Sequence, residues 1–284
     1  MRSWRYTLLP ILALLLLSCQ EGRAATASYI PHPDDPEEVV EYYLDRPAGE
    51  GPWPTVVLLH GHQAWLKPGG KDFVDWGALR TLAARGYLAV AISQPGYGGS
   101  TGPADYAGPR TVHAVEAVIT RLRGDGLVSP KRLVLEGVSR GALTAGLVAA
   151  EDPEVSGVVL ISGVYDLSAF VAEEGGGLVR SSIVSTLRAE SGGSAEALKE
   201  RSVLRSASRI KAALLILSGA EDDRADPDQA RALAAAVQAA GGRAKVVVYP
   251  GVGHKIPVEL RRADVDPFID ELLRGDGRGV GEGR

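Results

Sequence analysis

Cysteine is almost absent from this sequence. Cys19 is the single cysteine among 284 residues, so no disulfide can form within the chain and no zinc site built from cysteines is possible. Runs of lysine and arginine are missing too, and the net charge of −4 gives no basic surface for nucleic acid. With 45% hydrophobic and 23% charged residues, the composition is typical of a globular protein, and the length allows one large α/β domain.

A membrane-spanning length of apolar sequence is missing as well. Residues 8–17 form an apolar stretch broken only by Pro10, about half the ~20 residues that cross a bilayer. Arg2 and Arg5 precede this stretch, and the combination is typical of a signal peptide. We therefore expect residues 1–27 to be a signal segment and the mature protein to be an exported bacterial protein of the periplasm or cell envelope.

Two processing sites compete in the signal segment. Residues 16–19, Leu-Leu-Ser-Cys, resemble the bacterial lipobox, in which the cysteine is lipidated and becomes the first mature residue. Residues 25–27, Ala-Thr-Ala, fit instead the small-residue rule for simple cleavage. We expect lipidation of Cys19, which would attach the protein to a membrane, with simple cleavage as the alternative.

Apolar strand-like segments alternate with amphipathic helix-like segments from residue 39 onward. Residues 28–38 are rich in proline and acids and indicate an exposed lead-in, with His32 exposed. Continuous apolar strands separated by such helices predict an α/β fold with a doubly wound, mostly parallel sheet. The expected strands are 56–59, 88–92, 133–135, 155–161, 214–217 and 246–249, and the expected helices are 75–85, 112–122, 142–150, 228–240 and 258–273.

Two stretches depart from this alternation. Residues 166–210 predict a helical insert after the strand that follows the 142–150 helix, and long segments at such a place often cover a site. Residues 275–284 alternate glycine with polar residues and are expected to be disordered. The sequence thus predicts one domain over residues 28–274.

A nucleophile motif lies between an expected strand and an expected helix. Residues 137–141, Gly-Val-Ser-Arg-Gly, fit the G-x-S-x-G pattern of a tight strand-to-helix turn. The glycines permit this turn, which exposes the hydroxyl of Ser139 at the end of the sheet. The backbone N–H of Arg140, at the start of the helix, can then face a developing oxyanion. We predict that Ser139 is a catalytic nucleophile.

A base and an acid are expected at the same edge of the sheet. His254 follows the last expected strand, and a cluster of three acids, Glu221, Asp222 and Asp223, follows the strand before it. We choose Asp222 as the carboxylate that orients His254, while Glu221 and Asp223 stay open as alternatives. The chain order Ser139, Asp222, His254 is that of the α/β-hydrolases, unlike the orders of chymotrypsin and subtilisin.

The segment His60-Gly61-His62 ends an early strand. The loop at this place supplies the second oxyanion donor of such a fold, and we assign it to the backbone N–H of His62, with the His60 side chain locking the turn. A metal site on His60 and His62 is the alternative, but no further His or Cys cluster supports it. Residues 96–102 lack the third glycine of a dinucleotide loop. No cofactor or metal is therefore expected. Tyr97 and Trp65 either line the pocket or are ordinary surface or core aromatic residues.

These motifs resemble the catalytic domain of the prolyl oligopeptidase family within the α/β-hydrolase superfamily. The resemblance covers residues 40–274 and rests on segments 137–141, 201–204, 210–216, 219–222 and 250–254. Two features differ: the chain has no room for the family's N-terminal propeller, and Ala142 stands where a glycine often follows the nucleophile motif. Dienelactone-hydrolase-like enzymes and small carboxylesterases share the same bare domain.

Together the motifs predict a serine hydrolase that cleaves carboxylic esters through an acyl-enzyme. A peptidase acting on short peptides is one alternative, and a non-catalytic binding protein on the same fold is another. The expected partner is a small ester or short peptide.

Overall fold

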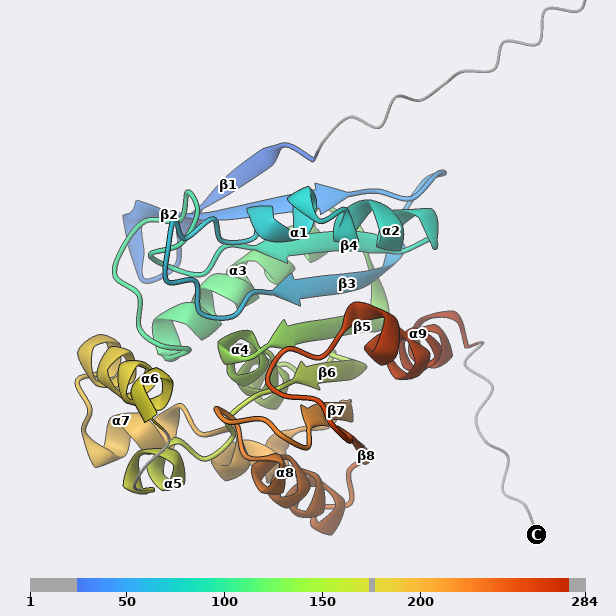
Figure 1. Ribbon diagram of the computed structural model, residues 1–284. Helices are drawn as coiled ribbons and strands as arrows, with labels where there is room; N and C mark the ends of the chain where they lie inside the picture. Colours follow the sequence, from blue (N-terminus) through green and yellow to red (C-terminus); the bar gives the residue numbers. More distant parts are fainter. Residues whose placement is uncertain (1–24, 174–176, 276–284) are drawn as a thin grey trace, which may run out of the picture.

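The computed structural model describes residues 25–173 and 177–275, which form one eight-stranded sheet covered by helices (Figure 1). The strands lie in the order β1-β2-β4-β3-β5-β6-β7-β8, with β2 antiparallel to both of its neighbours and all pairs from β4 to β8 parallel. The predicted α/β class with a mostly parallel sheet is confirmed. The strands are β1 (Ala27–His32), β2 (Asp35–Asp45), β3 (Trp53–Leu59), β4 (Leu88–Ile92), β5 (Val128–Val138), β6 (Gly157–Ile161), β7 (Ala213–Gly219) and β8 (Ala244–Tyr249).

Helices pack on both faces of this sheet, which explains why β4, β6 and β7 are buried along their whole length. Val115, Leu143 and Leu233, from α3, α4 and α8, belong to the core on one face. Leu79 and Ile269, from α2 and α9, belong to the core on the other. The covering helices are α1 (Lys71–Asp75), α2 (Ala78–Ala84), α3 (Pro109–Gly124), α4 (Arg140–Glu151), α8 (Pro227–Ala239) and α9 (Val258–Arg274).

The prediction of an exposed lead-in is wrong: residues 28–32 and 35–38 belong to β1 and β2, which form an antiparallel pair at the edge of the sheet with a turn at residues 33–34. Pro31 is compatible with an edge strand because no neighbour requires its missing N–H. His32 is 1% exposed instead of exposed, and its Nε2 lies 3.1 Å from the carbonyl oxygen of Arg110. Burial lowers the pKa of His32.

The helix expected at 75–85 is the shorter α2, and a separate helix, α1, ends at Asp75, where the expected helix would begin. Gly77 separates them because it adopts a left-handed conformation, with φ of 72°, which a continuous helix does not contain.

The helical insert predicted over residues 166–210 lies between β6 and β7. It contains α5 (Leu167–Ala172), α6 (Gly177–Ser191), α7 (Ala195–Glu200) and the 3-10 helix η1 (Val203–Arg209). In Figure 1, α5, α6 and α7 group on the side toward which the arrowheads of β3 and β5 point, so the insert lies toward the carboxyl ends of these strands.

Cys19, most of the expected signal segment and residues 276–284 lie outside the described residues. Within residues 25–173 and 177–275, no helix has the length and apolar character needed to cross a bilayer.

Candidate active site

Ser139 occupies the tight turn between β5 and α4. Its backbone has φ of 53° and ψ of −118°, a strained conformation for a residue with a side chain. The flanking glycines allow this turn: a Cβ on Gly137 would lie 2.1 Å from the carbonyl oxygen of Gly141, and one on Gly141 would lie 2.2 Å from that of Leu59. The Ser139 N–H donates to the carbonyl of Ile161 at 2.7 Å, so the turn is tied to the next strand.

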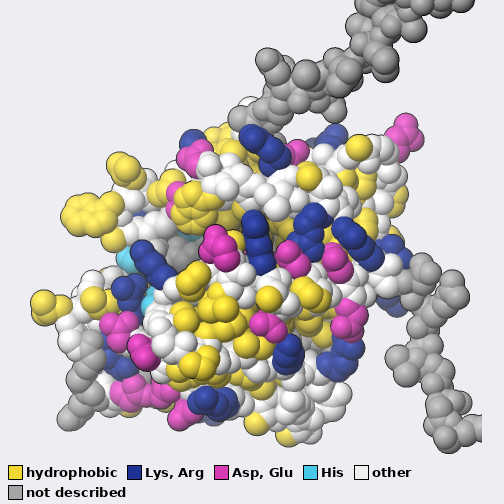
Figure 2. Space-filling model, turned by 45° about the vertical axis from the view of Figure 1, so that its right-hand side comes forward, with side chains coloured by type: hydrophobic (Ala, Val, Ile, Leu, Met, Phe, Trp, Pro, Cys, Tyr) yellow, Lys and Arg dark blue, Asp and Glu magenta, His cyan; other side chains and the backbone are white. Residues whose placement is uncertain are grey.

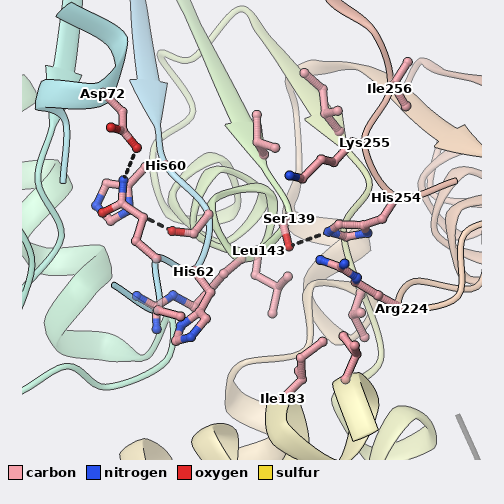
Figure 3. Close-up of a pocket in the computed structure, with 18 of the residues that line it drawn as sticks. His60, His62, Asp72, Ser139, Leu143, Ile183, Arg224, His254, Lys255 and Ile256 are labelled. Atoms are coloured by element: carbon pink, nitrogen blue, oxygen red, sulfur yellow. Dashed lines mark hydrogen bonds between the residues drawn. The ribbon is translucent and has the colours of Figure 1, made fainter. Parts of the chain in front are cut away.

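The structure brings His254 to Ser139 (Figure 3) and Asp222 to His254. His254 Nε2 lies 3.1 Å from Ser139 Oγ, and His254 Nδ1 lies 3.0 Å from both carboxylate oxygens of Asp222. Ser139, Asp222 and His254 come from the loops after β5, β7 and β8, and these three parallel strands end at the same edge of the sheet. Of the three acids considered, Glu221 and Asp223 are exposed.

The Asp222 carboxylate is fully buried and held from two sides. Besides His254, its Oδ1 accepts the backbone N–H groups of Arg224 at 2.9 Å and Ala225 at 3.0 Å. Gly219 permits the loops after β7 and β8 to pack together, since a Cβ there would lie 2.2 Å from the carbonyl oxygen of Val252. The carboxylate therefore meets the imidazole in one fixed orientation.

The turn after β3 is locked by the side chain of His60, which is 3% exposed. His60 Nδ1 lies 2.8 Å from the Gly61 carbonyl oxygen, Nε2 lies 3.1 Å from the Gln94 backbone nitrogen, and the Gln94 amide donates to the His60 carbonyl at 2.6 Å. Burial lowers the pKa of His60 to about 3, so the ring is neutral and uses one nitrogen as donor and the other as acceptor. Neither nitrogen is left for a metal.

This turn packs directly on the turn that carries Ser139. A Cβ on Gly61 would lie 3.0 Å from the Val138 carbonyl oxygen and 3.2 Å from Ser139 Cβ. His62 lines the cavity beside Ser139, and its Nδ1 lies 3.1 Å from the Tyr97 hydroxyl. The Arg140 N–H belongs to the first turn of α4, where backbone N–H groups have no partner within the helix.

The side chain of Arg140 has a second role that the sequence did not suggest. It is 3% exposed, and Nη1 lies 2.8 Å from Glu190 Oε2 on α6. Its guanidinium carbon lies 4.5 Å from the ring centroid of Tyr97 and 5.4 Å from that of Tyr106. Glu190 also accepts the Tyr106 N–H at 3.1 Å, so this group connects the insert to the turn that carries Ser139. No motif links residues this far apart in the sequence.

A cavity of about 800 Å³ opens beside Ser139 and His254. Its apolar wall includes Tyr106, Leu143, Leu178 and Ile183, from the loop before α3, from α4 and from α6. Trp65 is 86% exposed and Tyr97 is buried behind His62, so neither contributes to the cavity wall.

The fold and this site define an α/β-hydrolase of the serine type. A sequence model described as the prolyl oligopeptidase family (Peptidase_S9) matches residues 75–273, well over half of the chain. The chain therefore belongs to the prolyl oligopeptidase family and is a serine hydrolase.

Several proteins are similar to this chain over most of its length. An uncharacterized peptidase of Bacillus subtilis, YuxL, is 28% identical over 77% of this chain and 34% of its own length. A puromycin-hydrolyzing peptidase of Mycobacterium tuberculosis matches 88% of this chain and 40% of its own, with a TM-score of 0.71 and 22% identity. The Pyrococcus furiosus esterase Pf2001 matches 88% of this chain and 91% of its own, with a TM-score of 0.67 and 19% identity. The chain thus spans about a third of the YuxL peptidase and nearly the whole of the esterase.

Proposed function

We propose that this protein hydrolyses carboxylic esters through an acyl-enzyme on Ser139, with His254 as general base and Asp222 as the residue that orients it. The observation that carries the proposal is the continuous hydrogen-bonded series from Asp222 through His254 to Ser139 Oγ, with distances of 3.0 and 3.1 Å.

The first half of the reaction forms the acyl-enzyme. Ser139 Oγ bonds to the ester carbonyl carbon while its proton moves to His254 Nε2, and Asp222 stabilises the resulting imidazolium. The backbone N–H groups of His62 and Arg140 would donate to the oxyanion, each contributing about 3 kcal/mol to the barrier reduction. The bond to the leaving alkoxide then breaks, and His254 returns the proton to that oxygen.

The second half releases the acid. Water takes the place of the alcohol, gives a proton to His254 Nε2 and bonds to the acyl carbon. The bond to Ser139 Oγ then breaks, and the proton returns from His254 to the serine.

Two observations bear on the choice between ester and peptide substrates, and they favour different candidates. The Pyrococcus furiosus protein, of which this chain covers 91%, carries the name esterase, which favours ester cleavage by a domain of this size. The family match and the name of the YuxL peptidase favour a second candidate, a peptidase of prolyl oligopeptidase type acting on short peptides. Both use the same three residues.

A fluorophosphonate probe tests the nucleophile, because it bonds to serines activated by their surroundings. We expect labelling of the native protein, loss of labelling in Ser139→Ala and full labelling in Ser182→Ala. Ser182 also lines the cavity, on α6, and is therefore the matched control. Labelling that persists in a folded Ser139→Ala protein contradicts the proposal.

A matched pair of substrates separates the two candidates. We expect turnover of p-nitrophenyl butyrate and of unactivated ethyl butyrate, with no measurable cleavage of butyryl p-nitroanilide or of short peptide p-nitroanilides. Ready cleavage of a peptide p-nitroanilide would put the peptidase first.

We also propose that the protein is exported and lipidated at Cys19. The lipobox-like residues 16–19 and the apolar stretch before them support this proposal. Mass spectrometry of the protein from its native cell should find a diacylated N-terminal Cys19, lost in Cys19→Ser. An intact Met1 contradicts export.

A further inference from the structure

The charged side chains that line the cavity are mostly cationic. They are Arg140, Arg224, Lys255 and Arg261, against one acid, Asp72, among the described lining residues. The charge of Arg140 is neutralised by Glu190. The carboxylate of Asp72 accepts the Gln63 side-chain amide at 2.8 Å, and burial raises its pKa. The remaining positive charge therefore lies near His254.

Arg224 has hydrogen-bonding capacity that the folded chain does not use. Its Nε is buried and has no hydrogen-bond partner among the described residues. Asp223 Oδ1, the nearby carboxylate oxygen, lies 3.7 Å away, too far for a hydrogen bond, and that side chain is 74% exposed. The backbone of Arg224 is anchored because its N–H donates to the Asp222 carboxylate. The side chain, which is 35% exposed, therefore begins at a fixed point beside the reacting groups.

Lys255 follows His254 directly, and neither Lys255 nor Arg261 has an ion-pair partner within 4.0 Å in the described ranges. In Figure 3 the Lys255 and Arg224 side chains lie on either side of the Ser139–His254 hydrogen bond and extend into the cavity. Figure 2 shows lysine and arginine beside histidine at the hollow on the left of this face.

Much of the remaining cavity lining is apolar. It includes Tyr106, Leu143, Leu178 and Ile183, so the cavity offers apolar surface from α4 and α6 together with cations from the loops after β7 and β8. A ligand that matches both kinds of surface has an apolar chain and a negative group. A positively charged group, such as the free amine of a peptide, would meet the cations instead.

We propose that the substrates are esters whose acyl chain ends in a carboxylate, held by Arg224 and Lys255 while the chain contacts the apolar wall. This inference rests on the ester hydrolysis proposed above. The planar guanidinium of Arg224 matches a carboxylate, and the Lys255 amine adds a second charge-assisted hydrogen bond.

Three p-nitrophenyl esters of equal chain length test the charge preference. They are the hydrogen adipate, with a terminal carboxylate, the neutral hexanoate, and the 6-aminohexanoate, with a terminal ammonium. We expect kcat/KM to fall in that order, by about tenfold at each step, and the difference to shrink at high ionic strength. Equal or faster turnover of the hexanoate overturns the inference while leaving ester hydrolysis intact.

Single variants assign the preference to residues. Lys255→Met and Arg224→Gln should each reduce the adipate-to-hexanoate ratio of kcat/KM about tenfold, mainly through a higher KM for the adipate. The control is Arg262→Gln, an exposed neighbour of Arg261 outside the cavity wall, for which the ratio should match the native protein. An unchanged ratio in both cavity variants overturns the inference. If the native protein cleaves neither ester and Ser139 is not labelled, the proposed function fails and this inference with it.

Discussion

Helices α4 and α6 both border the cavity beside Ser139, and they are held in different ways. Helix α4 has twelve residues, of which eleven are buried, whereas α6 has fifteen residues and only Leu187 is buried. The place of α4 is set by the core on one face of the sheet, while that of α6 depends on a few contacts such as Glu190 with Arg140. The turn that carries Ser139 thus leads into a strongly packed helix, whereas the cavity-lining side chains of α6 lie on a part that can change at little cost to stability.

The largest expected effect comes from a truncation on α4. Leu143 lines the cavity yet is 2% exposed and belongs to the core. Leu143→Ala should lower the free energy of unfolding by about 3 kcal/mol, because buried contacts are lost and packed neighbours fill the space only partly. Urea unfolding at pH 7 measures this change. A loss below about 1 kcal/mol would mean that α4 is not fixed by the core in the way described.

The turn on which α4 packs should make stability depend on pH. Burial lowers the pKa of His60 to about 3 from an ordinary value near 6.5. Between these two pH values His60 is protonated in the unfolded chain and neutral in the folded protein. The stabilisation is complete above pH 6.5 and is lost as the pH falls toward 3, by about 1.4 kcal/mol for each pH unit.

Urea unfolding of the native protein and of His60→Asn at pH 7 and pH 4.5 checks this dependence. Asparagine can donate to the Gly61 carbonyl but does not titrate, so the variant should be less stable at pH 7 and should lose less stability on acidification. The same loss in both proteins would show that another group is responsible.

The ion pair between the two helices gives an intermediate effect. Arg140 and Glu190 have side chains 3% and 14% exposed, so Glu190→Gln leaves a buried cation without its counter-charge. We expect the free energy of unfolding to fall by about 2 kcal/mol and kcat/KM to fall about tenfold, because the support of α6 against the nucleophile turn weakens. Thermal unfolding and ester kinetics measure the two changes.

Two further variants check the cause of that effect. Glu196→Gln, at a side chain that is 87% exposed, should leave both values near those of the native protein. In the background of Arg140→Met, Glu190→Met should be much less destabilising than it is alone, since no buried charge then remains unpaired. Additive losses would argue against the ion pair as the link between the helices.

The same contrast explains what the sequence could predict. Strands β3 to β8 and the positions of Ser139, Asp222 and His254 follow from local signals, since an apolar run followed by a characteristic loop fixes which edge of the sheet a residue occupies. The sequence also predicts that the His60 side chain stabilises its turn, because a histidine at that strand end has backbone groups within hydrogen-bonding distance.

Other features depend on contacts between distant segments. The sequence does not indicate β1 and β2, because their prolines and acids favour a loop and only their antiparallel pairing makes them strands. The contact of Arg140 with Glu190, and the cationic side of the cavity, arise from tertiary packing that no spacing encodes.

The smallest expected effect on stability comes from truncating a leucine of α6 in the same way. Leu178 lines the same cavity as Leu143 but is 90% exposed, so Leu178→Ala removes almost no buried area and should change the free energy of unfolding by less than about 0.5 kcal/mol. Its contribution should appear in substrate choice instead. Removing an apolar contact from the cavity mouth should lower kcat/KM for p-nitrophenyl octanoate about threefold and leave the acetate nearly unchanged, because only the longer chain extends that far. A stability loss equal to that of Leu143→Ala would mean that both helices belong to one packed unit, whereas a change confined to the octanoate supports a fixed nucleophile side and an adjustable substrate side.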